Sequence, residues 1–519
     1  MEKQYGFGVL LLILFILLSA CPSGSSPDYF MLNDPGDFKR EAAFLSELLE
    51  DPDVLGPLSI APAGAEARGT ASIVIDFSVD TDASGPEGAA ANAGGPKGIP
   101  ISRTWLVPRA DPLAGRANTT LAACAGGVET LIPLEELRPP YTALRVDGLS
   151  VEDPGYPLVR EVRINLRAAS PEKKKRSGRE QRRIAEKIAA LEGLLRDSPK
   201  PLVMEQPEIL WIASAGDLML GRGAEDILLK EGPEGIFGGT AALLAGADLA
   251  LVNLEGAVSS RGTKAEKAYN FRFDPRTAPA LKDAGIDAVL LANNHVFDYG
   301  ETAFLDSLSH LQNTGINILG AGLNDTEAAR PRAFRKGKTA VQVFGLASFP
   351  QERSGWDGLR VAAEADKPGL LHAGRKGNVE QLKAHLSRDE EEALDIVLFH
   401  GGDEWSRQPN ASTRQLITDL IQQGADLIIG SHPHIVQGFE WVAGKPVFWS
   451  LGNYVFAGMD NTAGGDEGLF IRLGFAGSRM VYLEPYALTL SQNRTALAPQ
   501  ERVNNFYELS KALAPAPVK

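Results

Sequence analysis

The sequence predicts an α/β layered protein in which a smaller β-rich domain precedes a larger domain with a substantially parallel sheet. Two observations predict the larger domain. From residue 207 onward, four helical segments end in Gly, a small or apolar residue and Asp or Asn, directly before an apolar strand. Glycine can take the left-handed conformation that ends a helix. The strands are continuous apolar runs, which is typical of strands that are covered on both faces. The four glycines are Gly246, Gly285, Gly315 and Gly424.

The β-rich domain is predicted at residues 71–168. At 519 residues the chain is too long for one ordinary domain. Short apolar segments in this region alternate with tracts rich in Gly, Pro, Asp and Ala, as strands alternate with turns. No histidine occurs before His295, and we find no catalytic constellation here. We therefore expect an accessory domain that binds, docks or spaces, preceded by a linker at residues 21–70.

The N-terminus resembles an export signal. Residues 8–20 are an apolar run of signal-peptide length, shorter than the about 20 residues that span a bilayer. The run ends in Leu-Ser-Ala-Cys at residues 18–21, which resembles a bacterial lipobox with Cys21 as the lipidated residue. Residues 1–20 would then be a lipoprotein signal peptide. The alternatives are a plain signal peptide or an N-terminal anchor helix. Each places the rest of the chain outside the cytoplasm, and with the lipid anchor we expect it in the cell envelope, attached to the membrane and facing the periplasm or exterior.

Cysteine count and charge narrow the class of protein further. After processing at Cys21, Cys124 is the remaining thiol, so no intrachain disulfide can form. The formal net charge of −14 argues against binding to nucleic acid, which depends on Lys and Arg.

Two further segments flank the larger domain. Residues 169–206 form a basic helical linker, which either contacts an anionic surface or packs as a solvated helix against one domain. Residues 491–519 are predicted to be a C-terminal tail.

Polar residues follow six of the predicted strands in the larger domain. Sites in open α/β sheets form beyond the carboxyl ends of the strands. Imidazole and carboxylate groups suit Mn, Fe or Zn, so the pattern predicts a divalent metal site of one or two ions. The residues that follow the strands are Asp217, Asn253, Glu255, Asn293, Asn294, His295, His400, Glu404, His432, His434 and Asn453.

The motif GSHPHIVQG, at residues 430–438, contributes two of these histidines. His432 and His434 stand two residues apart, so in an extended backbone both side chains would point to one face. By itself the motif is also consistent with a polar turn. Its position beside the other strand ends favours metal ligands.

Several single residues have two interpretations each. Asp298 could cap the helix that follows it. Asn453 could contact substrate or hold a turn, and Asn293 could orient a loop or bind metal. Arg222 could meet an anionic substrate or be a surface charge. Trp405 could stack on a substrate or close the rim of the domain.

Six motifs together resemble a known family. GDLMLGR, NLEGAVS, NNHVFDYG, HGGDEW, GSHPHIVQG and SLGNYVF, in this order, resemble the CapA family of poly-γ-glutamate capsule-biosynthesis proteins. The fold of that family is similar to the calcineurin-like metallophosphatase sandwich. The resemblance covers about 210–475, within a domain that we place at 207–490. The combination is specific, whereas any one motif would be weak.

The resemblance implies metal ligands and two departures from the metallophosphatase pattern. Met219 stands where the histidine of an Asp-x-His motif is expected, and Asn253-Leu254-Glu255 replaces a Gly-Asp pair. Glu255 would then take the place of the bridging carboxylate, in a one-metal or altered site. His295 matches the histidine that acts on the leaving group. Residues at the family's other ligand positions are Asp217, Asn294, His400, His432 and His434.

The family implies a role in making, exporting or anchoring an anionic γ-glutamyl polymer, together with membrane-bound synthase subunits. If the site is catalytic, we expect metal-assisted attack of water at a phosphoryl or acyl centre. His295 would be the acid or base, with Glu404 positioning substrate or assisting proton transfer. Arg222, Asn253 and Asn453 would contact substrate. The alternatives are a surface metallohydrolase with another envelope substrate and a non-catalytic polymer-binding scaffold.

Overall fold

A computed structural model gives the structure of the chain, which divides into two compact units. The N-terminal unit comprises 1–107, 120–135 and 146–207, and the C-terminal unit comprises 108–119, 136–145 and 208–519. The described residues are 29–32, 59–61, 73–82, 99–111, 118–119, 123, 130–134, 137–153, 156, 159–168, 177–197, 202–203, 207–352, 355–387, 393–459 and 462–513.

The expected β-rich character of the N-terminal region is confirmed. Its main sheet has the strand order β10-β4-β9-β3-β1-β2, with β6 also paired to β4, and β7, which belongs to the C-terminal unit, pairs with the last residues of β4. Strands β3 and β9 pair antiparallel along their whole length. The strands are β1 (Tyr29–Leu32), β2 (Ser59–Ala61), β3 (Ile73–Asp82), β4 (Ile99–Ala110), β6 (Thr130–Pro133), β7 (Thr142–Ala143), β9 (Val159–Ala168) and β10 (Leu202–Val203), beside the separate pair β5 (Asn118–Thr119) and β8 (Arg145–Val146).

One helix of the N-terminal unit matches the predicted linker helix. Helix α4 (Gly178–Asp197) buries Ile184 and half-buries Ile188, two apolar residues four positions apart on one face of the helix. The predicted signal peptide and Cys21 lie outside the described residues. Within the part of the chain that the structure describes, no helix combines the length and apolar character required to cross a bilayer.

The C-terminal unit contains two mixed sheets. The first has the order β16-β15-β12-β11-β26-β27-β28, and β25 also pairs with β11. Strands β11, β12, β15, β16 and β25 run parallel, whereas β26, β27 and β28 are antiparallel. The strands are β11 (Leu210–Met219), β12 (Leu249–Leu254), β15 (Ala288–Leu290), β16 (Asn317–Leu319), β25 (Asn453–Phe456), β26 (Glu467–Ala476), β27 (Arg479–Ser491) and β28 (Arg494–Leu497).

The second sheet has the order β18-β19-β21-β22-β24-β23. Its four central strands are parallel, and the two edge strands are antiparallel. The strands are β18 (Arg332–Lys336), β19 (Thr339–Ser348), β21 (Ala393–Gly401), β22 (Leu427–Ser431), β23 (Phe439–Val442) and β24 (Lys445–Phe448), and two short pairs join β13 (Ala257–Val258) to β14 (Arg272–Phe273) and β17 (Ala321–Gly322) to β20 (Gly369–Leu370).

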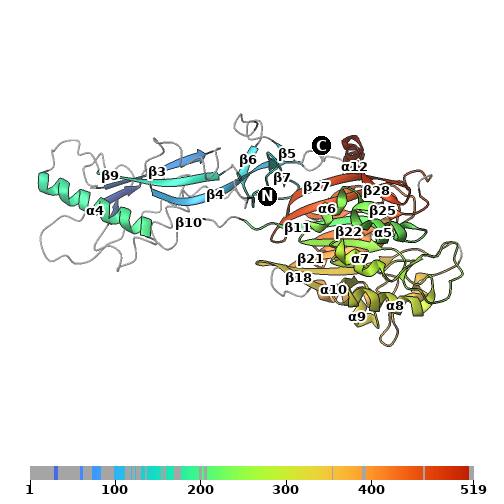
Figure 1. Ribbon diagram of the computed structural model, residues 1–519. Coiled ribbons are helices and arrows are strands. Elements are labelled where there is room, and N and C mark those ends of the chain that lie inside the picture. Colours follow the sequence, from blue (N-terminus) through green and yellow to red (C-terminus); the bar gives the residue numbers. More distant parts are fainter. Residues whose placement is uncertain are drawn as a thin grey trace, which may run out of the picture. The chain divides into compact units, whose positions relative to one another are not determined.

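Helices cover both sheets, as Figure 1 shows for the C-terminal unit, where α12 lies over β27 and α9 and α10 lie on the far side of the second sheet. The helices are α5 (Ala224–Phe237), α6 (Thr240–Ala245), α7 (Thr277–Asp283), α8 (Gly300–Asn313), α9 (Asp325–Ala329), α10 (Lys376–Leu386), α11 (Ala411–Gln422) and α12 (Gln500–Leu513), with a 3-10 turn η3 (Gly358–Val361). The layered α/β sandwich that the sequence predicts is confirmed.

Strand β21 shows why the strands read as continuous apolar runs. Ile396 and Leu398 belong to the large core, which contains residues of both sheets. Val397 and Phe399, which alternate with them, belong to a smaller core with helices α10 and α11. Successive side chains on a strand point to opposite faces, so a strand that is covered on both sides is apolar at every position.

Two expectations about the sheets need correction. The substantially parallel sheet that we expected is instead a pair of mixed sheets, which form the two layers of the predicted sandwich. The sequence hid the antiparallel half because β26 and β27 are also buried runs, joined by a tight turn at Gly477. Of the four helix-ending glycines, Gly285, Gly315 and Gly424 have positive φ angles, but Gly246 has φ −89°.

The predicted C-terminal tail also folds differently. Residues 494–497 form strand β28 and residues 500–513 form helix α12. Val503, Phe506 and Tyr507 of this helix are at most 4% exposed and belong to the large core. The segment is therefore part of the C-terminal unit, because its apolar residues recur at helical spacing and cover β27.

Candidate metal centre

The polar residues that follow the strands converge where both sheets of the C-terminal unit end. Asp217 lies in β11 and Glu255 directly follows β12, both in the first sheet. His400 lies in β21, and His432 and His434 follow β22, in the second sheet. All five side chains are buried, with Asp217, Glu255 and His400 fully so. These five residues lie at or just beyond the carboxyl ends of their strands, where the sequence analysis expected the site.

Asp217, Glu255 and His434 form the tightest group of potential ligands in the described residues. One ligand atom from each lies within 4.8 Å of the others. His434 Nδ1 lies 3.2 Å from Asp217 Oδ2, and His434 Nε2 lies 3.8 Å from Glu255 Oε1. Of the six predicted ligands, the structure thus joins three in one group.

The other three predicted ligands form a set next to this group. His400 Nε2 lies 3.0 Å from Asn294 Oδ1, and the rings of His400 and His432 are 4.7 Å apart. His400 Nδ1 lies 4.0 Å from Asp217 Oδ1, which links the two sets. Ser431, which sequence reasoning missed, places its Oγ 3.1 Å from His400 Nδ1.

Asn253 supports the ligands from inside the protein. Its Nδ2 donates to Asp217 Oδ1 at 2.8 Å and to Glu255 Oε2 at 3.3 Å, and it lies 3.1 Å from His400 Nδ1. Its Oδ1 accepts a hydrogen bond from Asn293. Because these contacts occupy both ends of the amide, the structure gives Asn253 a ligand-orienting place and not the substrate-facing one that we expected.

The loop after β22 does not have the extended backbone that the sequence argument assumed. His432 has φ 99° and His434 has φ 60°, so both adopt left-handed conformations that are rare for residues other than glycine. The His432 amide donates to Asp217 Oδ2 at 3.3 Å, which helps to hold the loop. Both histidines still reach the site, but by a tight turn.

His295 is held by a buried carboxylate. Its Nδ1 lies 2.6 Å from Asp298 Oδ2, and its Nε2 lies 3.7 Å from Glu255 Oε1. Asp298 Oδ1 in turn accepts from the fully buried ammonium of Lys267 at 2.8 Å. The capping interpretation of Asp298 is wrong, because the cap of α8 is Tyr299 and makes no side-chain hydrogen bond.

The partners of His295 differ in how far the sequence could reveal them. Asp298 follows His295 by three residues, a spacing that allowed the two side chains to meet. Lys267 comes from an irregular loop, where no periodicity marks a buried position.

The two asparagines with open interpretations both support loops. Asn293 Oδ1 accepts from the amides of His295 and Val296, which fits the loop-orienting alternative. Asn453 Nδ2 donates to the carbonyl groups of His434 and Gly465, and its Oδ1 lies 3.1 Å from His434 Nδ1. Asn453 is fully buried, so its turn-holding alternative is favoured over substrate contact.

Exposed residues border the buried cluster. The Trp405 ring is 41% exposed and its centroid lies 5.6 Å from that of His434. Arg222 is exposed and its guanidinium lies 5.0 Å from the centre of the Phe271 ring, which packs at 4.2 Å against His295. Glu404, beside Trp405, is also exposed. These groups are placed to meet a ligand that approaches from solvent.

Burial and mutual charge shift the titration of the cluster. Burial raises the pKa of Glu255, and the neighbouring carboxylate of Asp217 raises it further. Burial lowers the pKa of His295, His400 and His432. Burial alone would also lower the pKa of His434, but the carboxylates of Glu255 and Asp217 raise it to about 10. The buried carboxylates therefore attract positive charge.

The donor set fits a divalent cation. Glu255 Oε1 and both ring nitrogens of His432 are buried without a hydrogen-bond partner in the described residues. Buried polar atoms normally have partners, so orphaned atoms within one buried cluster indicate a missing ligand. Two carboxylates and several neutral imidazoles form a coordination set suited to Mn, Fe or Zn.

The comparisons with known proteins agree with the motifs. Residues 211–458 match the family described as bacterial capsule synthesis protein PGA_cap. This region is similar to the PGA_cap family. The PGA_cap region contains every residue of the cluster, from Asp217 to Asn453.

Two curated relatives carry CapA names. The PGA biosynthesis protein CapA of Bacillus subtilis is 28% identical over 255 residues, which are 48% of this chain and 64% of that protein. The capsule biosynthesis protein CapA of Bacillus anthracis is 28% identical over 261 residues, 49% of this chain and 62% of that protein. The chain thus spans less than two thirds of the length of either relative.

A solved phosphatase structure from Mycoplasma pneumoniae also matches the chain. It is 15% identical and has a TM-score of 0.34, covering 58% of this chain and 99% of that one. A score of this size does not establish a shared fold.

Proposed function

We propose that this chain acts at the cell envelope in the synthesis, export or anchoring of a poly-γ-glutamate-type anionic polymer, through a metal-dependent hydrolase site in its PGA_cap region. One observation carries the chemical part of the proposal. A fully buried pair of carboxylates, Asp217 and Glu255, meets His434 at the ends of both sheets. The CapA names of the curated relatives support the biological part.

In this proposal the ion is held by the residues of both sets, and when bound it supplies Lewis acidity. His295 moves the proton at Nε2, which faces Glu255 across 3.7 Å. Asp298 keeps His295 in one orientation by accepting from Nδ1. Arg222 and Trp405 contact the substrate at the rim, with Glu404 assisting. The proposed ligands are Asp217, Glu255, Asn294, His400, His432 and His434.

Charge balance favours one tightly bound ion. Asp217 and Glu255 contribute two negative charges, which equal the charge of one divalent cation. Asp298 is already balanced by Lys267. A second divalent ion would leave a surplus of positive charge in a buried site, where unpaired charge is costly. Met219 also favours a single ion, because it occupies the position where a further histidine ligand is expected. Its buried sulfur accepts a hydrogen bond from the Gly221 amide at 3.1 Å.

The decisive experiment is metal analysis of the purified full chain. We expect about one Mn, Fe or Zn per chain, with chelator lowering the Tm. A His432→Ala variant should lose most of the metal, whereas His310→Ala, on helix α8 away from the site, should keep it. Absence of bound metal together with a Tm unaffected by chelator would sink the metal site.

A hydrolysis assay distinguishes the hydrolase from the alternative, a non-catalytic polymer-binding scaffold. The presence of Met219 where a metal-binding histidine is expected favours the scaffold. Metal-loaded protein should cleave a γ-glutamyl polymer or a phosphoester, and His295→Gln should lower the rate while retaining the metal. If the metal-loaded protein cleaves neither substrate, the scaffold replaces the hydrolase.

The envelope location has a test of its own. We propose a lipid anchor at Cys21, on the basis of the sequence at 18–21. A Cys21→Ala variant expressed in a bacterial host should lose labelling by fatty acid and leave the membrane fraction. Unchanged labelling would remove the anchor from the proposal, and the plain signal peptide would take its place.

A further inference from the structure

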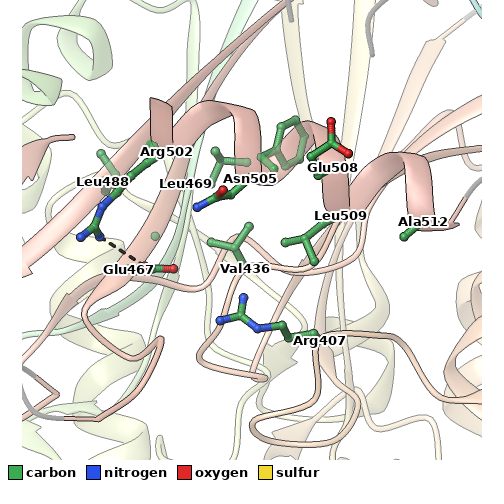
Figure 2. Close-up of a pocket in the computed structure, with 13 residues that line it drawn as sticks. Arg407, Val436, Glu467, Leu469, Leu488, Arg502, Asn505, Glu508, Leu509 and Ala512 are labelled. Atoms are coloured by element: carbon green, nitrogen blue, oxygen red, sulfur yellow. Dashed lines mark hydrogen bonds and ion pairs between the residues drawn. The ribbon is translucent and has the colours of Figure 1, made fainter. Parts of the chain in front are cut away.

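A pocket lies against helix α12 in the C-terminal unit. It has a volume of about 420 Å³ and lies between α12, strands β26 and β27, and a loop that carries Arg407 (Figure 2). The apolar residues Val436, Leu469, Leu488 and Phe506 line it, and each is at most 8% exposed. This volume and this apolar lining are typical of small-molecule sites.

Among the described charged side chains that line the pocket, Arg407 is the one without an ion-pair partner. Arg502 pairs with Glu467 at 3.3 Å, and Glu508 pairs with Lys511 at 2.8 Å. Arg407 is exposed and has no hydrogen-bond or ion-pair partner among the described residues. Figure 2 shows the Arg502–Glu467 pair as a dashed line, and no such line reaches Arg407. The pocket thus presents one unpaired guanidinium beside an apolar surface.

This combination selects a ligand chemistry. A guanidinium binds a carboxylate through two parallel hydrogen bonds, which makes arginine well suited to that group. The apolar lining excludes a fully hydrated anion and accommodates methylene groups. The Asn505 amide on α12 also lines the pocket and can add a hydrogen bond. The fitting ligand carries a carboxylate next to a short run of methylene groups.

The pocket and the metal cluster share their walls. One wall segment contains Trp405, which packs on His434, and Arg407, which lines the pocket. The other contains His434 and Val436, whose Cα atoms can be no more than about 7 Å apart. The Trp405 amide donates to the Pro433 carbonyl at 2.9 Å. A ligand in the pocket would therefore lie next to the metal cluster.

A second hydrogen bond joins the same two segments. Gln437 Nε2 donates to the carbonyl of Ser406 at 2.7 Å, and Gln437 itself is buried. Two hydrogen bonds thus join the segment that contains Arg407 to the segment that contains Val436, and they hold the backbones of the two segments together.

We propose that this pocket binds a carboxylate that lies next to a short run of methylene groups, with Arg407 as its anchor. Resting on the proposed function, the pocket is the subsite for a polymer unit next to the one at the metal cluster. A γ-linked glutamate unit has this chemistry, since its free carboxylate is on the α-carbon, which two main-chain methylene groups join to the next amide. A free fatty acid shares the chemistry and is the other source.

Calorimetric titration of the chelator-treated full chain tests the proposal with two probes, a short γ-glutamate oligomer and octanoate. We expect saturable binding of the oligomer, and a Kd raised at least about tenfold by Arg407→Gln, because a hydrogen-bonded charge pair is lost. Ala512→Phe, which fills the pocket from the exposed face of α12, should have the same effect. Arg330→Gln, an exposed arginine outside the pocket, is the matched control.

The outcomes separate the two proposals. Binding of octanoate alone, with the same dependence on Arg407, would support the carboxylate pocket and overturn its assignment to the polymer. Binding of neither probe, or binding that both pocket variants leave unchanged, would overturn the pocket. Because the titration uses metal-free protein, a failed metal site would leave this result unaffected.

Discussion

Replacing Asp298 by Asn should destabilise the protein strongly, although the two side chains have the same shape. Asp298 is fully buried and accepts from three donors. Its Oδ1 accepts from Lys267 at 2.8 Å, and its Oδ2 accepts from the Phe271 amide at 2.7 Å and lies 2.6 Å from His295 Nδ1. An asparagine offers one oxygen and one NH2 group. Whichever way the amide turns, its NH2 faces at least one of these donors.

The magnitude follows from what Lys267 loses. Breaking a buried ion pair by removing one partner costs about 3–5 kcal/mol, because a charge remains uncompensated. Lys267 keeps Glu352 at 2.8 Å and the carbonyl of Asn294 at 2.5 Å. These contacts place the expected loss in the free energy of unfolding near the lower end, at about 3 kcal/mol.

Urea unfolding of the full chain, followed by circular dichroism, measures this loss. The matched control is Asp226→Asn, since Asp226 pairs with Lys230 and the two side chains are 63% and 71% exposed. Exposed pairs contribute about 0–1 kcal/mol, so the control should change little. An Asp298→Asn variant that unfolds within 1 kcal/mol of the wild type, or that matches the control, would refute the reasoning.

Three further changes should show equally specific effects. Burial and the nearby Asp426 raise the pKa of Asp395 from 3.8 to about 7, so the folded state loses stability as pH rises through this window. At pH 8 the Asp395→Asn variant should therefore have a higher Tm than the wild type, and its free energy of unfolding should be larger by about 1 kcal/mol after allowance for solvent screening. Near pH 4 the two proteins should have the same Tm. Gly216→Ala would place a Cβ 1.9 Å from the Gly452 carbonyl oxygen. It should cost at least about 2 kcal/mol in urea unfolding or abolish soluble expression, and a wild-type transition would contradict it. Phe506→Ala should cost about 3–5 kcal/mol in the same assay, whereas no change would mean that α12 is dispensable.

The sequence predicted the chemistry of the site better than the course of its backbone. Asp217, Glu255 and His434 were identified because each lies at the end of an apolar run or within a few residues of it. Residue type and position at a strand end are local properties, so they are visible in the sequence. The left-handed angles of His432 and His434 were not, because neither residue type favours them and the surrounding fold imposes them.

The supporting residues were harder to foresee for a related reason. Lys267 reads as a loop lysine, and such residues are nearly always solvated. Its burial depends on Asp298 and Glu352, which lie 31 and 85 positions later in the chain and meet it only in the folded protein. Asn253 likewise gives no local sign that its amide contacts two carboxylates.

The glycines of the motifs have a structural purpose that unites the motifs. A Cβ on Gly216 would lie 1.9 Å from the Gly452 carbonyl oxygen, and one on Gly430 would lie 2.0 Å from that of Trp449. A Cβ on Gly401 would lie 2.2 Å from the carbonyl oxygen of Ser348. Gly216 and Gly401 lie on strands directly beside Asp217 and His400, and Gly430 lies two residues before His432, so the backbones there approach more closely than any side chain permits. Asp217, on the first sheet, lies within hydrogen-bond distance of the histidine loop on the second. The glycine sets the local backbone spacing and a residue one or two positions away supplies the ligand, which explains why the two occur together in these motifs.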